Sequence, residues 1–468
     1  MSQSLRRHPA LAGLLSHFGQ GRLGSQASWV MVPFAGQQVV RLGTNVILAG
    51  LLAPEMFGIM LLINTLRTGV ELLSDIGIGQ SVVRSPNGED QRFLDTAWTL
   101  QLLRGALLWA ITVAAAAPLG TIYGQPELVL IILAVSPVFL FTGLQSPGLF
   151  LVQRQMRLRA RAAYDVGTTV FQCAFTIALA AVMPSVWALV WGLVVSTFFS
   201  MVMSYLVGTR RLPKFAWDRP ALGEILNFGK WIFLSTVLYF AATSTDRIYF
   251  VAALPLALAG VYAIARTFAE LFDQLAQRAG AMLIFPKLAM MGDGRGEAAA
   301  RLRAKRRMLL ALVAVALGGA AAVADRLIML LYDDRYVLAA FMLPILFAGV
   351  WFRVLGAFAD SMLMGCGRPT PGAVANGMKF AVLALGLPLA MAYADIFAAL
   401  LVLILAEIAR WIVLAPILQG ERLARVTDDL ALTLLAAVAA IGFKLALGAA
   451  GLVPTLDQWW ALGAPLRG

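Results

Sequence analysis

Long apolar runs alternate with short polar segments along the whole chain. An α-helix needs roughly 20 apolar residues to cross the hydrocarbon core of a membrane. Apolar residues follow one another within each run and do not alternate with polar ones, which favours helices over the strands of a β-barrel. The pattern therefore predicts an all-α polytopic membrane protein with about 13 membrane-spanning helices, within a range of 12 to 14. The thirteen runs cover residues 28–52, 56–83, 94–118, 127–151, 162–182, 185–207, 226–253, 257–285, 308–331, 338–364, 373–393, 396–418 and 430–450.

Composition agrees with this interpretation. Of 468 residues, 60% are hydrophobic and 13% are charged, and the mean hydropathy is +0.81. Ordinary soluble domains have roughly 45–50% apolar and 25% charged residues. A soluble enzyme is thus excluded, and so is a basic soluble nucleic-acid binder, although the net charge is +12. We expect no nucleic-acid partner and no folded domain outside the membrane, because the loops between the runs are short.

Basic residues are distributed very unequally between the two sets of loops. If the N-terminus is cytoplasmic, 23 of the 37 Lys and Arg residues lie in cytoplasmic loops and only two, Arg335 and Arg467, lie outside. Such an asymmetry is typical of membrane proteins, whose cytoplasmic loops are enriched in Lys and Arg. The sequence therefore predicts a cytoplasmic N-terminus and, with 13 spans, an outer C-terminus anchored at the interface by Trp459 and Trp460. A short or half-inserted fourteenth segment at 452–466 stays open.

The two halves of the chain show weak self-similarity at an offset of about 201 residues. Six spans separate equivalent positions, so both halves enter the membrane in the same direction and the pseudo-symmetry axis lies along the membrane normal. The string R-T-x-x-E-L also occurs twice, at 67–72 and 266–271, but its offset of 199 disagrees with that alignment, and we treat it as partly coincidence. We predict a cytoplasmic tail at 1–27, a first six-helix lobe at 28–207, a cytoplasmic linker at 208–225, a second six-helix lobe at 226–418, and a peripheral helix and tail at 419–468.

Twelve basic residues remain within the apolar runs. Each costs at least roughly 2.5–3.5 kcal/mol at the bilayer centre, so such groups are expected to face a bundle interior or a wet cavity. One interpretation is that the deep arginines converge on a central cleft and bind an anionic headgroup, because the guanidinium fork suits phosphate. The alternative is internal pairing: Arg67 with Glu71, Arg266 with Glu270, and Glu407 with Arg410. The substrate-binding candidates are Arg41, Arg67, Arg247, Arg266 and Arg353.

Acidic residues within the runs are candidates for coupling transport to H⁺ or Na⁺. The best candidates by depth and by closeness to arginines are Glu71, Asp246 and Glu270. Asp360 follows Arg353 by seven residues, which is two helical turns along one face, and we expect that face to line the cleft. Charge balancing is the alternative role for each of them.

No catalytic, metal or cofactor site is expected. Both histidines, His8 and His17, lie in the N-terminal tail, and the two cysteines, Cys173 and Cys366, are far apart in the sequence. Neither arrangement matches a metal site or a disulfide framework. A membrane-embedded polysaccharide polymerase or ligase would need a sizeable outer loop with catalytic groups, whereas the predicted outer loops are a few residues long.

Several strings in order carry a family resemblance. They are L-A-P-E-M-F-G-I-M running to L-L-S-D-I-G-I-G-Q-S-V-V-R (52–84), V-Q-R-Q-M-R-L-R-A-R-A (152–162), F-G-K-W (228–231), G-V-Y-A-I-A (260–265) and F-P-K-L (285–288). With them, roughly residues 25 to 420 resemble the oligosaccharide flippases of bacterial polysaccharide biosynthesis. The similarity is to the branch of colanic-acid-type and succinoglycan-type exporters within the multidrug/oligosaccharidyl-lipid/polysaccharide exporter superfamily.

The resemblance implies two six-helix lobes, as in multidrug-extrusion proteins, around a cationic cavity that faces the cytoplasm and the periplasm in turn. It implies a bacterial inner-membrane location, an oligosaccharide repeat unit on undecaprenyl pyrophosphate as substrate, and polymerase partners at the inner membrane or in the periplasm. It supplies no catalytic motif and no fixed positions for cavity arginines. Two alternatives stay open: a multidrug or cation antiporter of the same fold, for which the deep charges lean too basic, and a peptidoglycan lipid precursor flippase.

Overall fold

The structure is a computed structural model that describes residues 22–208, 212–279, 296–366, 368 and 370–466. Expectations for most of the N-terminal tail, including both histidines, and for the F-P-K-L string lie outside these residues. All regular structure in the described ranges is helical. The first half of the chain forms α2 (Arg22–Leu51), α3 (Pro54–Leu72), α4 (Ile78–Arg84), α5 (Gln91–Ile122), α6 (Pro126–Val135), α7 (Pro137–Gly143), α8 (Gly148–Arg154), α9 (Leu158–Val182) and α10 (Val186–Val207).

The second half repeats the plan with longer uninterrupted helices. Its helix starts follow from local sequence: Asp218 accepts a hydrogen bond from Ala221 N at 3.1 Å before α11, and Asp395 accepts one from Ala398 N at 2.7 Å before α17. Such side chains satisfy backbone N–H groups that have no partner within the helix. The elements are α11 (Arg219–Ala253), α12 (Leu256–Ala279), α14 (Gly296–Leu331), η3 (Asp334–Tyr336), α15 (Val337–Gly365), α16 (Thr370–Tyr393), α17 (Ile396–Gly420), α18 (Val426–Ala449), α19 (Leu456–Leu462) and η4 (Ala464–Leu466).

Each of the thirteen predicted apolar runs contains a helix, although two runs are interrupted. The second run divides into α3 and α4 where Gly77 adopts a positive φ of 65°, a backbone conformation that favours glycine. The fourth run divides into α6, α7 and α8, and Pro137 occupies the first position of α7, where its missing N–H costs no hydrogen bond. The apolar pattern showed where the helices lie, and the prolines within the fourth run indicated a kink there, but the break at Gly77 was not predicted.

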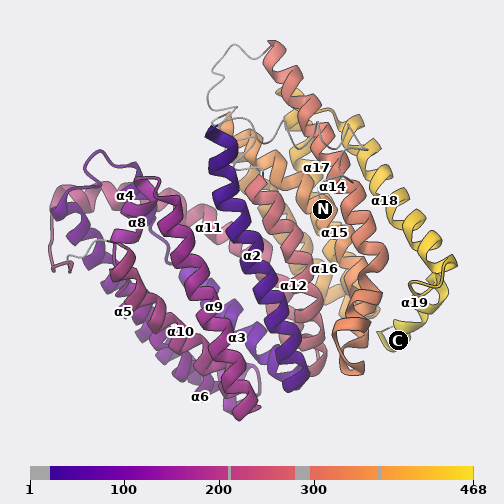
Figure 1. The fold of residues 1–468 in the computed structure, drawn as a ribbon, viewed down its shortest axis with the longest axis horizontal. Coiled ribbons are helices and arrows are strands. Elements are labelled where there is room, and N and C mark those ends of the chain that lie inside the picture. The colour runs from indigo at the N-terminus through magenta and orange to yellow at the C-terminus, as the bar shows by residue number, and fades with distance from the viewer. Residues whose placement is uncertain (1–21, 209–211, 280–295, 367, 369, 467–468) are drawn as a thin grey trace, which may run out of the picture.

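Nine helical segments in the described part of the chain are long and apolar enough to cross a membrane: α5, α6 with α7, α9, α10, most of α14, η3 with most of α15, α16, α17 and α18. The remaining long helices, α2, α3, α11 and α12, carry polar or charged residues within their apolar sequences. These four helices lie between the outer helices in the middle of the molecule (Figure 1), and α2 also carries exposed apolar residues such as Val32 and Val39. Polar side chains in membrane helices are expected at such interior positions.

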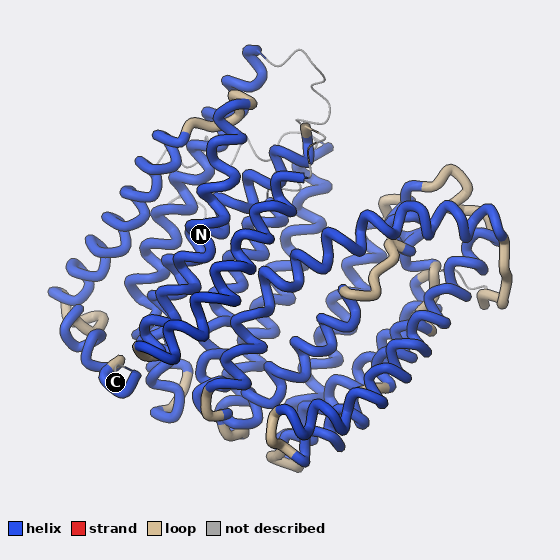
Figure 2. Tube along the Cα trace, turned by 180° about the vertical axis from the view of Figure 1, so that it is seen from behind, coloured by secondary structure: helices blue, strands red, loops and turns tan. Residues whose placement is uncertain are grey.

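The helices form two groups that converge at one end of the molecule and diverge towards the end that carries α4 and α8 (Figures 1 and 2). In the first group α2 packs on α9, α9 on α10, and α5 on α6 and α7. In the second group α12 and α17 pack on α15, and α16 packs on α11 and α17. The groups meet mainly where α3 of the first packs against α12 and α11 of the second.

Two glycines allow the backbones of α3 and α12 to approach closely. A Cβ atom on Gly58 would lie 2.3 Å from Leu256 O, and one on Gly260 would lie 1.8 Å from Pro54 O. Neither space admits a side chain, because the opposing atoms belong to the backbone. Gly58 is the fifth residue of α3 and Gly260 is the fifth residue of α12, so the two helices cross near their N-termini. Small residues at such crossings are typical of tightly packed membrane helices.

The C-terminal helices lie at the periphery. α18 packs on α14, and a buried ion pair joins Arg306 to Asp429, whose closest atoms are 2.5 Å apart. Lys444, on α18, forms a second buried pair with Asp325. α19 has seven residues, too few to cross a membrane. Its Trp459 ring stacks on Phe341 at 5.0 Å between centroids, so this tryptophan packs on α15 as well as lying near the chain end.

Candidate functional site

A cavity of about 460 Å³ lies between the two helix groups. α2, α3, α9 and α10 form one wall, and α11 and α12 form the other. Four cationic side chains line this space together with one carboxylate, so its lining carries a net positive charge. Its polar and charged lining residues include Gln38, Arg41, Asn45, Asn64, Arg67, Gln172, Arg247, Arg266, Glu270 and Gln274.

The lining residues of each central helix share one face. On α2 the sequence positions are 38, 41, 45 and 48, and on α12 they are 263, 266, 270 and 274. Steps of three and four residues return to the same side of a helix. The charged members of these faces were predicted from the sequence, whereas amides such as Asn64 and Gln172 were not. The sequence does indicate these amides, because they interrupt the apolar runs at the same three- and four-residue steps as the charged residues.

On the wall of the first group, two arginines remain open to the cavity. Arg41 is exposed, and 27% of the Arg67 side-chain surface is accessible. Arg67 Nη1 donates to Glu71 Oε1 at 2.9 Å, which is the expected pair one helical turn apart. Its Nε has no hydrogen-bond partner. Both guanidinium groups therefore retain donors that a ligand could use.

On the opposite wall the charges are joined in a network. Glu270 Oε1 accepts hydrogen bonds from Arg247 and from Arg266 Nε, the latter at 2.9 Å. Arg266 Nη1 also donates to Asp246, and the Tyr262 hydroxyl donates to the same carboxylate. Only 7% of the Arg266 side chain and 3% of Asp246 are accessible. The predicted Arg266 and Glu270 pair is thus confirmed, but it belongs to a larger buried cluster.

One contact ties the two walls together. Gln38 on α2 donates from Nε2 to Gln274 Oε1 on α12 at a distance of 2.6 Å. Both residues line the cavity. The contact is between neutral amides, so separating the walls would replace one hydrogen bond by bonds to water at little net cost.

Two predicted candidates lie elsewhere. Arg353 on α15 donates to Glu407 at 2.8 Å and lies 3.7 Å from Asp273. Asp360 pairs with Arg410. Neither belongs to the cavity lining, so the expectation that the face of Arg353 and Asp360 lines the cleft is wrong. That face instead packs on α16 and α17 within the second group.

The predicted pair of Glu407 with Arg410 is also wrong. Glu407 accepts from Arg353 and from Lys379 Nζ, which is 2.6 Å away on α16. Arg410 turns to α15 and α16, where Asn376 accepts from its Nε at 2.9 Å. Glu407 and Arg410 pair with residues of other helices and not with each other. Each buried charge needs a partner on the side that it faces, and these two side chains face different helices. Lys379, which was not among the predicted site residues, completes this cluster.

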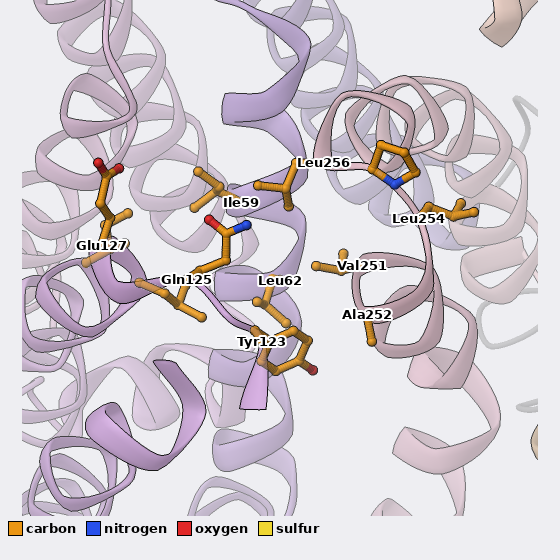
Figure 3. A pocket seen from close by; sticks show the side chains of 12 residues that line it. Ile59, Leu62, Tyr123, Gln125, Glu127, Val251, Ala252, Leu254 and Leu256 are labelled. Carbon is orange, nitrogen blue, oxygen red and sulfur yellow. The ribbon is translucent and has the colours of Figure 1, made fainter. Parts of the chain in front are cut away.

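A smaller pocket of about 180 Å³ lies at the convergent end of the two groups. Figure 3 shows Tyr123, Gln125 and Glu127 on the side of the first group, facing Val251 and Leu256 of the second. Its lining contains no basic residue. This pocket is unsuited to an anion, and the cationic cavity is the candidate binding site.

The sequence matches the family described as "Polysaccharide biosynthesis protein" over residues 47–340, more than half of the chain. A curated relative is the succinoglycan biosynthesis transport protein ExoT of Rhizobium meliloti (strain 1021), which is 23% identical over 315 residues. This match covers 66% of the chain and 63% of the length of that relative.

Solved transporter structures share the fold over most of the chain. The lipid II flippase MurJ in an inward closed conformation aligns with a TM-score of 0.71 at 10% identity, over 90% of this chain and 99% of MurJ. An inward-facing multidrug resistance MATE transporter of the MOP superfamily aligns with a TM-score of 0.62 at 16% identity, over 86% and 96% of the two chains. An outward-facing MATE structure gives 0.56 at 15% identity, over 90% and 98%. The prediction of an all-α, two-lobe, multidrug-extrusion-like fold is confirmed.

Proposed function

The chain belongs to the polysaccharide biosynthesis protein family, as a multi-pass membrane protein, and we propose that it flips an undecaprenyl-pyrophosphate-linked oligosaccharide across the bacterial inner membrane. The observation that carries the proposal is the convergence of four arginines from α2, α3, α11 and α12 on one cavity: Arg41, Arg67, Arg247 and Arg266. Two phosphates and several sugars cannot enter hydrocarbon without losing their hydration. A wet cavity with guanidinium donors replaces that hydration with charge-assisted hydrogen bonds.

The shape and charge of the molecule support alternating access. The helix groups diverge at the end that carries α4 and α8 (Figure 1), and the loops at that end hold most of the basic residues. The positive-inside rule supports a cytoplasmic position for that end, and we propose an inward-facing state with a cytoplasmic N-terminus. At the other end the crossing of Gly58 and Gly260 closes the path.

Among the four candidates for ion coupling, Glu270 is the best placed. It lines the cavity and accepts from two arginines of the proposed binding site, Arg247 and Arg266. Protonation or Na⁺ binding at Glu270 would release these arginines for the substrate phosphates, and substrate release would restore the pair. Asp246 is almost completely buried, Glu71 has one arginine partner, and Asp360 lies away from the cavity.

Complementation with single variants tests the proposal. In a bacterium that lacks this protein, Arg41→Ala and Arg67→Ala should each reduce surface polysaccharide and cause the lipid-linked repeat unit to accumulate on the cytoplasmic side. Arg326→Ala is the matched control, because Arg326 is exposed on α14, away from the cavity. Full export by both cavity variants, at normal protein levels, would contradict an anion-binding role.

The main alternative is a flippase for a peptidoglycan lipid precursor, which the fold likeness to MurJ suggests. Such a substrate also carries a pyrophosphate, so the cavity suits both. Expression in a cell depleted of its own lipid II flippase distinguishes them. Rescue of growth would favour the peptidoglycan precursor, whereas rescue of surface polysaccharide alone would favour the proposed substrate. A cation antiporter is disfavoured because cationic drugs would be repelled by the arginines.

A further inference from the structure

A second, apolar crevice adjoins the cationic cavity on the side of the first helix group. It runs between α3 and α5 and is closed at the back by α6 and α7. Its volume is about 70 Å³, against about 460 Å³ for the cavity. The lining includes Leu66 and Val70 of α3 and Ile111 and Leu119 of α5. The crevice is therefore too small and too apolar for sugars, but its apolar lining suits a hydrocarbon chain.

Arg67 lies at the junction of the two spaces. It lines the cationic cavity and it also lines the crevice. Its Nε is buried and has no partner, and so is the hydroxyl of Thr112 on the crevice wall. The remaining lining is hydrocarbon. A ligand with an anionic head and an apolar chain would thus meet a cation where its head ends and its chain begins.

The crevice reaches the outer surface of the helix bundle. Ile111 is 48% exposed, and on a membrane-spanning helix such an apolar surface faces lipid. α3 packs mainly on α11 and α12, whereas α5 packs on α6 and α7, so different partners hold the two sides of the seam. One end of the seam is tied by Arg104, which donates to Glu71 O at 2.5 Å and to Ser74 Oγ at 3.0 Å.

We propose that the crevice between α3 and α5 binds the first isoprenoid units of the lipid-linked substrate while its phosphates contact Arg67. The inference rests on the proposed function and adds the path of the lipid chain. A chain in the crevice stays in apolar surroundings while the head stays in the wet cavity, so neither part is transferred to an unfavourable medium. The chain can then remain in the bilayer throughout transport.

Filling the crevice tests this path. Ala115 lines the crevice on α5, whereas Ala117 is exposed on the same helix and is not among the lining residues. For the purified full-length protein in nanodiscs, Ala115→Trp should weaken binding of undecaprenyl pyrophosphate at least tenfold, and Ala117→Trp should change it less than twofold. Wild-type-like binding by Ala115→Trp, with binding lost in Arg67→Ala, would overturn the crevice but not the proposed function. A wild-type protein that binds no undecaprenyl pyrophosphate would overturn both.

Photo-crosslinking of the wild-type protein keeps the test independent of whether Ala115→Trp folds. Undecaprenyl pyrophosphate with a diazirine on its first isoprenoid unit should label residues 63–70 and 111–119, and unlabelled undecaprenyl pyrophosphate should compete. A phospholipid with a diazirine in its acyl chain is the control. Labelling of other helices alone would overturn the inference. The inference would also be overturned if the phospholipid labelled the crevice and undecaprenyl pyrophosphate did not reduce this labelling.

Discussion

The string R-T-x-x-E-L occurs on α3 and on α12, and the two copies face the same cavity in different surroundings. On α3, 27% of the Arg67 side chain and 30% of Glu71 are accessible. On α12 the values are 7% for Arg266 and 25% for Glu270. The α12 copy also contacts Asp246, Tyr262 and Arg247 of the second group. The same local sequence thus gives an open ion pair in one lobe and a buried network in the other.

This difference suggests a division of roles between the lobes. A half-exposed pair contributes little to stability, so its arginine can change partner at low cost. A buried charge that loses its partner is strongly destabilising. We infer that the α3 copy is the part of the site that exchanges its partner for substrate. The α12 copy stabilises the second lobe. Its arginine takes part in binding only when the ion pairs of Glu270 with Arg247 and Arg266 break.

The largest expected effect tests whether the α12 copy is an anchor. Asp246→Ala leaves Arg266 buried without its main carboxylate, which typically destabilises a protein by about 3–5 kcal/mol. We expect a lower melting temperature in detergent and reduced protein levels. The double variant Asp246→Ala with Arg266→Met should recover much of the loss, because the uncompensated charge is removed. A stability near that of the wild type for Asp246→Ala would contradict the proposed role of α12.

The next effect concerns ligand binding by the α3 copy. Hydrogen bonds to charged groups contribute about 1.5–3 kcal/mol each, so Arg67→Ala should weaken undecaprenyl pyrophosphate binding by about 10- to 150-fold. Its melting temperature should change little, since the lost pair is half exposed. Arg266→Ala should differ from Arg67→Ala by a large loss of stability, because Arg266 belongs to the buried network. Binding assays and thermal unfolding on both variants measure the contrast, which disappears if the two copies are equivalent.

The close crossing of α3 and α12 determines the relative position of the two R-T-x-x-E-L copies. Gly260→Ala places a Cβ against Pro54 O, and such overpacking typically costs about 1–3 kcal/mol. Because the crossing closes the outer end, we expect the protein to populate outward-open states more. Native Cys173 lines the cavity, so its alkylation by a membrane-impermeant maleimide from the outer side should become faster. Gly167→Ala is the control, since a Cβ there meets open space; equal rates would contradict this gate.

Much of the fold followed from the sequence because hydrophobic periodicity is a local property. Apolar runs located a helix in all thirteen places, and the weak repeat indicated two lobes. The break at Gly77 was missed because a positive φ within an apolar run leaves no hydrophobic signal. The short α19 was left open because length alone did not decide whether 452–466 inserts.

The candidate site was predicted in part. Depth identified Arg41, Arg67, Arg247 and Arg266, which do line the cavity. Depth did not separate them from Arg353, because equal depth says nothing about which way a helix face points. Pairing along a helix was predictable for Arg67, where no other helix offers a carboxylate in the described structure, but failed for Arg410 on α17. There, contacts between distant segments decide the partner, and the sequence does not show them.

The smallest expected effect on stability is that of Glu71→Gln, which tests directly whether Arg67 and Glu71 form a readily broken pair on α3. Glu71→Gln removes the only ion-pair partner of Arg67 in the described residues, and ion pairs one helical turn apart contribute about 0.3–0.5 kcal/mol. Melting should therefore shift by little, while undecaprenyl pyrophosphate binding should be unchanged or modestly tighter, because the substrate no longer competes with a carboxylate. Glu270→Gln removes a partner of two arginines and should destabilise more. If Glu71→Gln instead abolished binding, Glu71 would be orienting Arg67 for the substrate, and the pair on α3 would be part of the bound state.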